Sequence, residues 1–305
     1  MTAKVILNPY AGRWEAGERK NEIESALINA EVEFELEITD EPGHGTLLAE
    51  RAVQQGFNPI IAAGGDGTYS EIINGIVRAN NNDGSTYFGL LPLGSANDLA
   101  DNLKLPRDLS LAAKIIANGK VERMDLCQVN GRFFGNNAAI GLEPTVTLIQ
   151  QDITRLKGNL RYLTATLIAV MRKQEWVMEL EWEGGQYSGS ISLVTVGNTP
   201  RTGGIFYMTP NANPFDGLLT FVYGYMPTRR NILALLPRTT KPGNGSYVEH
   251  PAVFEIHSPW LKVQAKTPTP AHADGEIFAE DIHNLEYKVI PNCLPVLLDI
   301  NPFAA

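Results

Sequence analysis

The stretch AAGGDGT at residues 62–68 constrains this chain more than any other part of it. It joins an apolar, strand-like run at residues 58–65 to a helix-like run at residues 70–79. Its glycines, Gly64, Gly65 and Gly67, are expected to take positive φ and to let a ligand approach the backbone without obstruction by a Cβ atom. Consecutive amides in such a turn, followed by a helix N-terminus, favour a bound anion.

Asp66 is the unusual member of this turn, because a carboxylate repels a phosphate. It fits the turn if it holds a Mg²⁺ ion that bridges the phosphates. Thr68 and Ser70 can donate hydroxyl hydrogen bonds or cap the helix. The turn therefore predicts a nucleotide-phosphate site with a metal ion. The alternative is an ordinary strand-to-helix turn in which Asp66 is a cap.

Around the turn, short apolar runs alternate with helical patterns. Strand-like runs occur at residues 4–9, 31–39, 58–65 and 87–94, and helix-like runs follow them at 18–30, 45–56, 70–79 and 95–103. This alternation predicts a doubly wound α/β domain with a mostly parallel sheet, over residues 1–128. Such sheets bind ligands at the carboxyl ends of their strands, which is where the glycine turns fall.

The pattern changes after about Arg123. Strand-like runs separated by Gly, Pro and Asn predict a mainly antiparallel β-sandwich domain over residues 129–305, with a turn at Asn130-Gly131. The last residues are expected to pack back on the first domain. Two helical stretches interrupt the pattern, at about Leu156 to Arg172 and at residues 228–238.

Composition narrows the class of protein. The net charge of −9 argues against a nucleic-acid partner and against strong attraction of the whole molecule to anionic membranes. The two cysteines, Cys127 and Cys293, have no metal or redox spacing, which fits a reducing cytoplasm. The longest apolar candidate helix, residues 162–171, is about half as long as a bilayer requires. The five histidines show no ligand spacing and are interpreted as packing residues.

Three further stretches, taken together with GGDGT, resemble one family. They are NPYAGR at residues 8–13, LLPLGSANDLA at 90–100 and HADGEIF at 272–278. GGDGT alone is shared by diacylglycerol kinases, sphingosine kinases, NAD kinases and phosphofructokinases. The four motifs, in this order, resemble the diacylglycerol kinase and sphingosine kinase family, and in particular its soluble bacterial lipid kinases, over essentially the whole chain. The family usually has Thr where this chain has Ser95.

The resemblance implies an ATP- and Mg²⁺-dependent kinase with Asp274 as the general base. Glu276 would orient that base or bind metal, and Asp66 would act at the metal and the phosphates. The remaining ATP-binding residues implied by the resemblance are Asn8, Gly12, Arg13, Thr39, Gly64, Gly65, Gly67, Thr68, Tyr69, Ser70, Gly94, Ser95 and Asn97. For Asp274 taken alone, an ordinary turn aspartate before glycine is the alternative.

The resemblance also implies a second, structural Mg²⁺. Its ligands would be Asn213, Asp216 and the backbone carbonyl of Leu218, although Phe215 stands where an aspartate is frequent. The alternative is a plain hairpin turn. Asp98 and Asp125 match aspartates that would connect this metal to the active site, and as alternatives they are a helix cap and a strand-end residue.

The implied reaction is transfer of the γ-phosphoryl group of ATP to a lipid hydroxyl, with diacylglycerol giving phosphatidic acid. Monoacylglycerol, ceramide, a sphingoid base and phosphatidylglycerol are left open as acceptors. An NAD kinase and a non-catalytic nucleotide- or lipid-binding protein are the alternatives. The protein would reach its lipid by transient membrane contact, and Arg229 and Arg230 beside the apolar residues 232–236 could dock there. An amphipathic helix that faces the core explains the same stretch.

Overall fold

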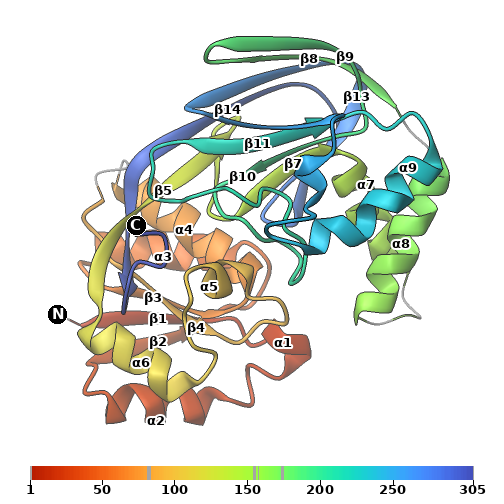
Figure 1. The fold of residues 1–305 in the computed structure, drawn as a ribbon. Coiled ribbons are helices and arrows are strands. Elements are labelled where there is room, and N and C mark those ends of the chain that lie inside the picture. The colour runs from red at the N-terminus through yellow and green to blue at the C-terminus, as the bar shows by residue number, and fades with distance from the viewer. Residues whose placement is uncertain (1, 81–83, 154–155, 157, 173–174, 305) are drawn as a thin grey trace.

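The computed structural model describes residues 2–80, 84–153, 156, 158–172 and 175–304, which form two lobes (Figure 1). The first lobe has a parallel sheet in the order β4-β3-β1-β2. Its strands are β1 (Ala3–Leu7), β2 (Phe34–Ile38), β3 (Ile60–Gly64) and β4 (Phe88–Pro92). Every residue of β1, β3 and β4 is buried, as expected for parallel strands covered on both faces.

Helices cover both faces of this sheet. Ile6 and Ile60 pack with α3 (His44–Gln54) and α4 (Asp66–Asn80), while Leu7 and Ile61 pack on the other face with α2 (Lys20–Asn29) and α6 (Leu109–Asn118). Successive side chains of a strand point to opposite faces, which produces these two cores. The predicted doubly wound lobe is confirmed. Two short helices, α1 (Ala11–Trp14) and α5 (Asp98–Asn102), follow β1 and β4.

The second lobe is antiparallel and sandwich-like, as predicted. Its strands are β5 (Lys120–Val129), β6 (Arg132–Phe134), β7 (Asn137–Gly141), β8 (Trp176–Trp182), β9 (Gly185–Ile191), β10 (Leu193–Gly197), β11 (Leu219–Gly224), β12 (Val253–Ser258), β13 (Trp260–Ala273) and β14 (Glu276–Leu298). Asn130 and Gly131, both with positive φ, form the turn between β5 and β6, as expected.

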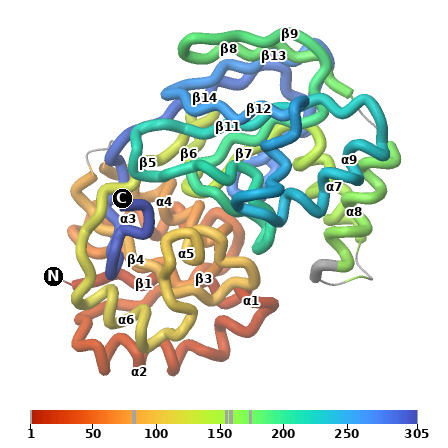
Figure 2. The backbone as a smooth tube through the Cα atoms, viewed as in Figure 1, coloured from red at the N-terminus to blue at the C-terminus, as the bar shows by residue number. Residues whose placement is uncertain are grey.

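Two long strands connect the lobes. β14 pairs with β13 near its start and with β4 near its end, where Val296 lies opposite Phe88 in a parallel pair. β5 runs antiparallel to β14, with an irregularity between Ile290 and Leu294. The chain thus crosses between the lobes along β5 and returns along β14 (Figure 2). The domain boundary near residue 128 stays a prediction.

Three helices lie beside the second lobe: α7 (Leu142–Asp152), α8 (Gly158–Arg172) and α9 (Arg229–Leu235), the last continued by the 3₁₀ helix η1 (Leu236–Thr240). α8 and α9 were predicted, whereas α6 and α7 were not. α7 contains Pro144 and several β-branched residues, but Pro144 lies in the first turn, where a missing N–H costs nothing. No helix within the described residues has the length and apolar character needed to cross a bilayer.

Candidate functional site

The strands β1, β3 and β4 end at the same edge of the parallel sheet, and the turns that follow them meet there. The register pairs Leu7 with Ala63 and Gly64 with Pro92. Asn8 donates from Nδ2 to the Thr68 hydroxyl at 3.0 Å. The amides of Leu93 and Gly94 both donate to the Gly64 carbonyl, at 2.8 and 3.1 Å. Motifs more than 80 residues apart in the chain are therefore hydrogen-bonded into one surface.

The glycines of GGDGT serve close packing, and the expectation of positive φ was wrong. None of Gly64, Gly65 and Gly67, all within described residues 2–80, has a positive φ. A Cβ atom on Gly64 would lie 2.4 Å from the Thr68 hydroxyl, and one on Gly65 would lie 2.9 Å from the Gly94 Cα. The two glycine turns thus touch backbone to backbone. Positive φ occurs instead at Gly12, whose Cβ would lie 2.5 Å from the Leu93 carbonyl oxygen.

We expect Gly94→Ala to reduce the free energy of unfolding by about 1–3 kcal/mol, the usual range for overpacking. The new Cβ would lie 2.5 Å from the Gly65 Cα, and neither backbone can rotate away. ATP affinity should fall with it, because the two turns separate. Thermal unfolding and ATP titration measure both effects. Gly243→Ala is the matched control, since Gly243 has open space around it. Equal behaviour of the two variants would contradict the packing role.

Several residues of the first turn point inward. Tyr69 is buried, and its hydroxyl donates to the Gly64 carbonyl at 2.9 Å. Ser70 is buried too, and its hydroxyl has no hydrogen-bond partner among the residues that the structure describes. The Tyr69 hydroxyl thus reaches the turn from the buried side, while its contact with a nucleotide stays a prediction. Tyr69 positions the Gly64 carbonyl.

The other predicted ATP-site residues differ in accessibility. Arg13 and Ser95 are exposed, and Thr39 is buried with its amide donating to the Leu7 carbonyl at 2.9 Å. Asn97 is buried and braces the second turn, because its side chain accepts from the Gly94 amide and donates to the Gly94 carbonyl, both at 2.8 Å. Arg13 has φ +65°, a left-handed conformation that non-glycine residues rarely adopt.

Asp66 connects the two glycine turns. One carboxylate oxygen accepts a hydrogen bond from the Leu99 amide at 3.1 Å, at the start of α5. Burial raises the pKa of Asp66, and the backbone amides near α5 oppose that rise. Asp66 therefore does act as a cap, although for α5 and not for its own helix. Its negative charge adds to the rise in the pKa of Asp98 and of Asp274 that burial causes, so both carboxylates lie within electrostatic reach of Asp66.

Asp274 occupies the turn between β13 and β14. It has φ +47° and is followed by Gly275 at +80°. Its carboxylate accepts hydrogen bonds from the amides of Gly135, Asn136 and Asn137, at 3.0, 2.9 and 3.1 Å. Burial nevertheless raises the pKa of Asp274 to about 6, with a smaller contribution from the charge of Asp66. A carboxylate with this pKa is ionised at neutral pH and is a competent proton acceptor.

Glu276 lies between the two lobes. It forms an ion pair with Arg132, and a Cβ on Gly67 would lie 3.8 Å from its Oε1 atom. The turn that carries Asp274 and Glu276 therefore faces the start of α4. Burial raises the pKa of Glu276, while Arg132 lowers it. The ion pair between Arg132 and Glu276 was not expected from the sequence, because β6 and β14 are far apart in the chain and come together only in the folded protein.

The predicted structural metal loop, residues 213–218, contains the expected oxygen atoms. Asn213 accepts from the Phe215 amide at 3.0 Å, and Asp216 accepts from the Leu218 amide at 2.9 Å. Asp125 accepts from the Gly217 amide at 2.7 Å; burial raises the pKa of Asp125, and the charge of Asp216 adds to the rise. Two carboxylates that repel each other beside carbonyl and amide oxygens fit a hard cation.

Among the described residues, Asp98 makes its hydrogen bond and its ion pair outside that loop. Its carboxylate accepts from the Gly204 amide at 2.8 Å and lies 3.6 Å from the Arg201 guanidinium, so the expected link from the metal loop is supported for Asp125 alone. Burial raises the pKa of Asp98 to about 7, with the charge of Asp66 adding to the rise. Arg201 also pairs with Asp101 at 2.5 Å.

A metal between the glycine turns would need ligands from outside the protein. Within the described residues, no three His, Cys, Asp or Glu side chains surround a common metal position. Asp66 and its neighbouring carboxylates supply negative charge, and phosphate oxygens and water would complete the coordination of a Mg²⁺ ion, which usually binds in this way. The residues present fit that arrangement.

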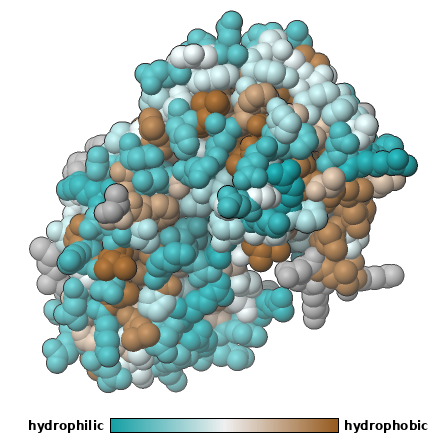
Figure 3. Space-filling model, in the orientation of Figure 1, coloured by the Kyte–Doolittle hydropathy of each residue, from teal (hydrophilic) through white to brown (hydrophobic). Residues whose placement is uncertain are grey.

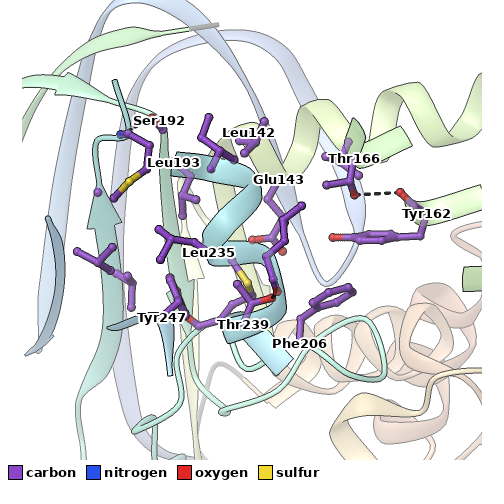
Figure 4. A pocket seen from close by; sticks show the side chains of 18 residues that line it. Leu142, Glu143, Tyr162, Thr166, Ser192, Leu193, Phe206, Leu235, Thr239 and Tyr247 are labelled. Atoms are coloured by element: carbon purple, nitrogen blue, oxygen red, sulfur yellow. Dashed lines mark hydrogen bonds between the residues drawn. The ribbon is translucent and has the colours of Figure 1, made fainter. Parts of the chain in front are cut away.

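An apolar cavity lies in the second lobe between α7, α8, α9 and the strands β10 and β11 (Figure 4). Its volume is about 80 Å³. Leu142, Phe206, Met226, Ile232 and Leu235 line it. The stretch at residues 228–238, one candidate for membrane docking, therefore faces the core in part, because Ile232 is buried and Leu235 lines the cavity.

An exposed apolar surface lies on α8 and not on the stretch at residues 228–238. Leu160, Leu163, Leu167 and Met171 are between 43% and 61% exposed and follow one another at helical spacing. On the other side of the same helix, Tyr162 and Thr166 line the cavity. Figure 3 shows apolar side chains gathered over α8, below a hydrophilic projection near α9. The sequence alone did not reveal this surface, because an apolar helix too short to span a bilayer is most often packed in the core.

Two family models match adjoining parts of the chain. Residues 2–129 match the "Diacylglycerol kinase catalytic domain", and residues 136–298 match the "YegS C-terminal NAD kinase beta sandwich-like domain". A diacylglycerol kinase of Staphylococcus aureus (strain bovine RF122 / ET3-1) is 28% identical over 278 residues, covering 90% of this chain and 85% of the relative. The enzyme of strain MRSA252 matches equally well. A diacylglycerol kinase crystal structure from Bacillus anthracis str. Sterne shares the fold with a TM-score of 0.76 at 20% identity, over 100% of this chain and 98% of that one.

Proposed function

Since the chain belongs to the family of lipid kinases that joins a diacylglycerol kinase catalytic domain to a YegS-type β-sandwich domain, we propose that it transfers the γ-phosphoryl group of ATP, with Mg²⁺, to the hydroxyl of diacylglycerol or a related lipid. One observation carries this proposal. The Asp274 carboxylate, held by three backbone amides and with a pKa near 6, lies within electrostatic reach of Asp66 in the glycine turn. This proximity supports a general base at Asp274 that acts beside phosphates bound at the turn.

The chain's own residues divide the work of the reaction. Backbone amides at the start of α4, in the GGDGT turn, hold the phosphates, since the amides of Leu93 and Gly94 in the second turn already donate to the Gly64 carbonyl. Asp274 takes the proton of the lipid hydroxyl while the oxygen of that hydroxyl attacks the γ-phosphorus. The bond from the γ-phosphorus to the β,γ-bridging oxygen breaks, and ADP leaves. When bound, Mg²⁺ supplies charge neutralisation at the phosphates, and Asp66 is the residue that would hold it. Arg132 keeps the Glu276 carboxylate beside the start of α4.

The cavity favours a lipid over NAD as the phosphoryl acceptor. Its lining is mostly apolar and is formed by α7, α8 and α9 together with β10 and β11. A dinucleotide carries charged phosphates, which the apolar side chains leave without hydrogen-bond partners and the Glu143 carboxylate in the same wall repels. An acyl chain buries only apolar surface there.

We expect α8 to hold the enzyme at an anionic bilayer. The exposed Leu160, Leu163, Leu167 and Met171 can insert into the interface, and the exposed Arg229 and Arg230 of the neighbouring α9 can face anionic headgroups. Because the same helix lines the cavity with Tyr162 and Thr166, a lipid would have a short path from bilayer to cavity.

The double substitution Leu163→Glu and Leu167→Glu should weaken binding to phosphatidylglycerol-containing vesicles at least about tenfold, because each exposed leucine loses about 1.5–3 kcal/mol of burial. Vesicle co-sedimentation measures the change. Leu111→Glu, on the exposed face of α6, is the matched control and should bind as the wild type does. If the double variant also binds normally, α8 is not the docking surface.

The pH profile of the kinase activity should fall at acidic pH, because Asp274 becomes protonated there. Its pKa is raised to about 6, so the carboxylate is ionised at pH 7 and becomes protonated as the pH falls. Because the base acts only when ionised, kcat/KM is expected to fall about tenfold per pH unit below pH 6. Initial rates between pH 5 and 8 at saturating Mg²⁺ measure this. A rate that stays constant down to pH 5 would exclude Asp274 as the titrating base.

The proposal itself is tested by labelled γ-phosphate transfer from ATP with Mg²⁺. The acceptors are a panel of lipids in mixed micelles, with NAD in parallel and the Asp274→Asn variant as control. Label in a lipid that disappears in the variant supports the proposed function. Label in NAD would show a NAD kinase, and ATP binding without label in any acceptor would favour a non-catalytic binding protein.

A further inference from the structure

A carboxylate lies in the wall of the apolar cavity. Glu143 is in the first turn of α7, and its side chain is only 13% exposed. In Figure 4 it points into the space between α8 and α9, among apolar side chains. A charged side chain is costly in such surroundings unless its oxygens receive hydrogen bonds. The partners of Glu143 therefore decide what the cavity can hold.

Only one of its two oxygens is satisfied. Oε1 accepts from the Asn137 side-chain amide at 3.0 Å and lies 3.3 Å from the His272 Nε2 atom. Oε2 is buried and has no hydrogen-bond partner among the residues that the structure describes. A water molecule can donate to Oε2 while the cavity is empty. When an apolar chain displaces that water, the ligand has to provide the donor.

Asn137 links the Glu143 carboxylate, through its Oε1 atom, to the proposed base. Its backbone amide donates to Asp274 at 3.1 Å, and its side-chain amide donates to Glu143 at 3.0 Å. His272, on the other side of Glu143, precedes Asp274 by two residues on β13. The two carboxylates are thus separated by the span of a single residue.

We propose that Glu143 selects acceptor lipids that carry a second hydrogen-bond donor, a hydroxyl or an amine, beside the hydroxyl that is phosphorylated. This inference rests on the proposed lipid kinase function. Diacylglycerol has one hydroxyl, which Asp274 engages, and its remaining headgroup oxygens are ester acceptors. It leaves the buried oxygen of Glu143 unpaired. A monoacylglycerol or a sphingoid base has a free donor on the adjacent carbon and satisfies it.

The test compares kcat/KM for three acceptors in mixed micelles: a 1,2-diacylglycerol, a 1-monoacylglycerol and a sphingoid base. The wild type should favour at least one of the two lipids with a second donor about tenfold or more, because a site built to accept a hydrogen bond rejects analogues without the donor. Glu143→Leu should remove this preference and leave the rate with diacylglycerol equal or higher.

Two further variants keep the result interpretable. Glu143→Gln retains an acceptor oxygen but loses the charge, so it should keep the preference for a second hydroxyl and lose a preference for an amine. Glu179→Leu, on the exposed surface of β8, should leave all three rates unchanged. Thermal unfolding and ATP affinity confirm that each variant is folded.

The outcomes separate this inference from the proposed function. Equal or better turnover of diacylglycerol by the wild type, unaffected by either Glu143 substitution, overturns the role of Glu143 and leaves the kinase intact. Failure to phosphorylate any lipid removes the proposed function itself. A sphingoid-base preference lost in Glu143→Gln identifies the donor as an amine, and a monoacylglycerol preference retained in that variant identifies it as a hydroxyl.

Discussion

Asp274→Asn is expected to lower kcat about a thousandfold or more while ATP affinity changes little. The substitution removes the group that takes the lipid proton, and general-base catalysis contributes about 10²–10⁴ in rate. It preserves the size of the side chain in the turn between β13 and β14. Single-turnover phosphoryl transfer and ATP titration measure the two quantities separately.

The stability of this variant should remain close to that of the wild type. The pKa of Asp274 is raised from 3.8 to about 6, so the folded protein disfavours its charge at pH 7. A neutral side chain avoids that cost, although its amide nitrogen meets one of three backbone donors. Asp281→Asn, at an exposed position of β14, is the matched control and should retain full activity. Normal turnover by Asp274→Asn would exclude it as the base.

Asp66→Asn is expected to reduce kcat about 10²- to 10³-fold, the usual effect of losing one group that stabilises charge in the transition state. The structural role of Asp66 should survive, because an asparagine oxygen can still accept from the Leu99 amide. The Mg²⁺ concentration needed for half-maximal rate should rise, since a charged ligand has become neutral. Rates measured over a Mg²⁺ titration test this directly.

A second readout distinguishes loss of charge from loss of shape at this position. The charge of Asp66 raises the pKa of Asp274, so its removal should move the acidic limb of the rate profile to lower pH. Thermal unfolding should be unchanged or slightly higher, because the folded state disfavours the charge of Asp66 as well. If the variant unfolds at a lower temperature than the wild type and the acidic limb of its pH-rate profile does not shift, Asp66 stabilises the fold and does not act on the phosphates.

Much of the first lobe could be predicted from the sequence alone. The alternation of apolar runs and helical patterns predicted a parallel sheet covered on both faces, and the turn residues after β1, β3 and β4 were recognised from their composition. Local patterns suffice here, because each strand-turn-helix unit has its own periodicity and the turns must then share one edge of the sheet. Even so, the conformational reason expected for the glycines, positive φ, was wrong. Gly65 and Gly94 avoid a collision across two turns, and only the paired backbones reveal it.

Longer-range features of the site could not be predicted. Glu143 and His272 contact each other, and Arg132 contacts Glu276, between segments that lie far apart in the chain. Nothing in the immediate neighbours of these residues distinguishes them from surface or packing residues. α8 shows the same limit. Its apolar pattern is evident in the sequence, but which apolar side chains remain exposed depends on how α7 and α9 cover it.

The sequence by itself therefore determined the two glycine turns, the alternation of strands and helices in the first lobe and the family. These depend on backbone conformation and on short-range periodicity. The tertiary structure alone decided that Asp274 lies within electrostatic reach of Asp66, that Asn137 joins Asp274 to Glu143, and that α8 presents leucines outward. The physical reason is that burial, pKa and hydrogen-bond satisfaction belong to the surroundings of a side chain, and those surroundings exist only after β14 has returned to the first sheet.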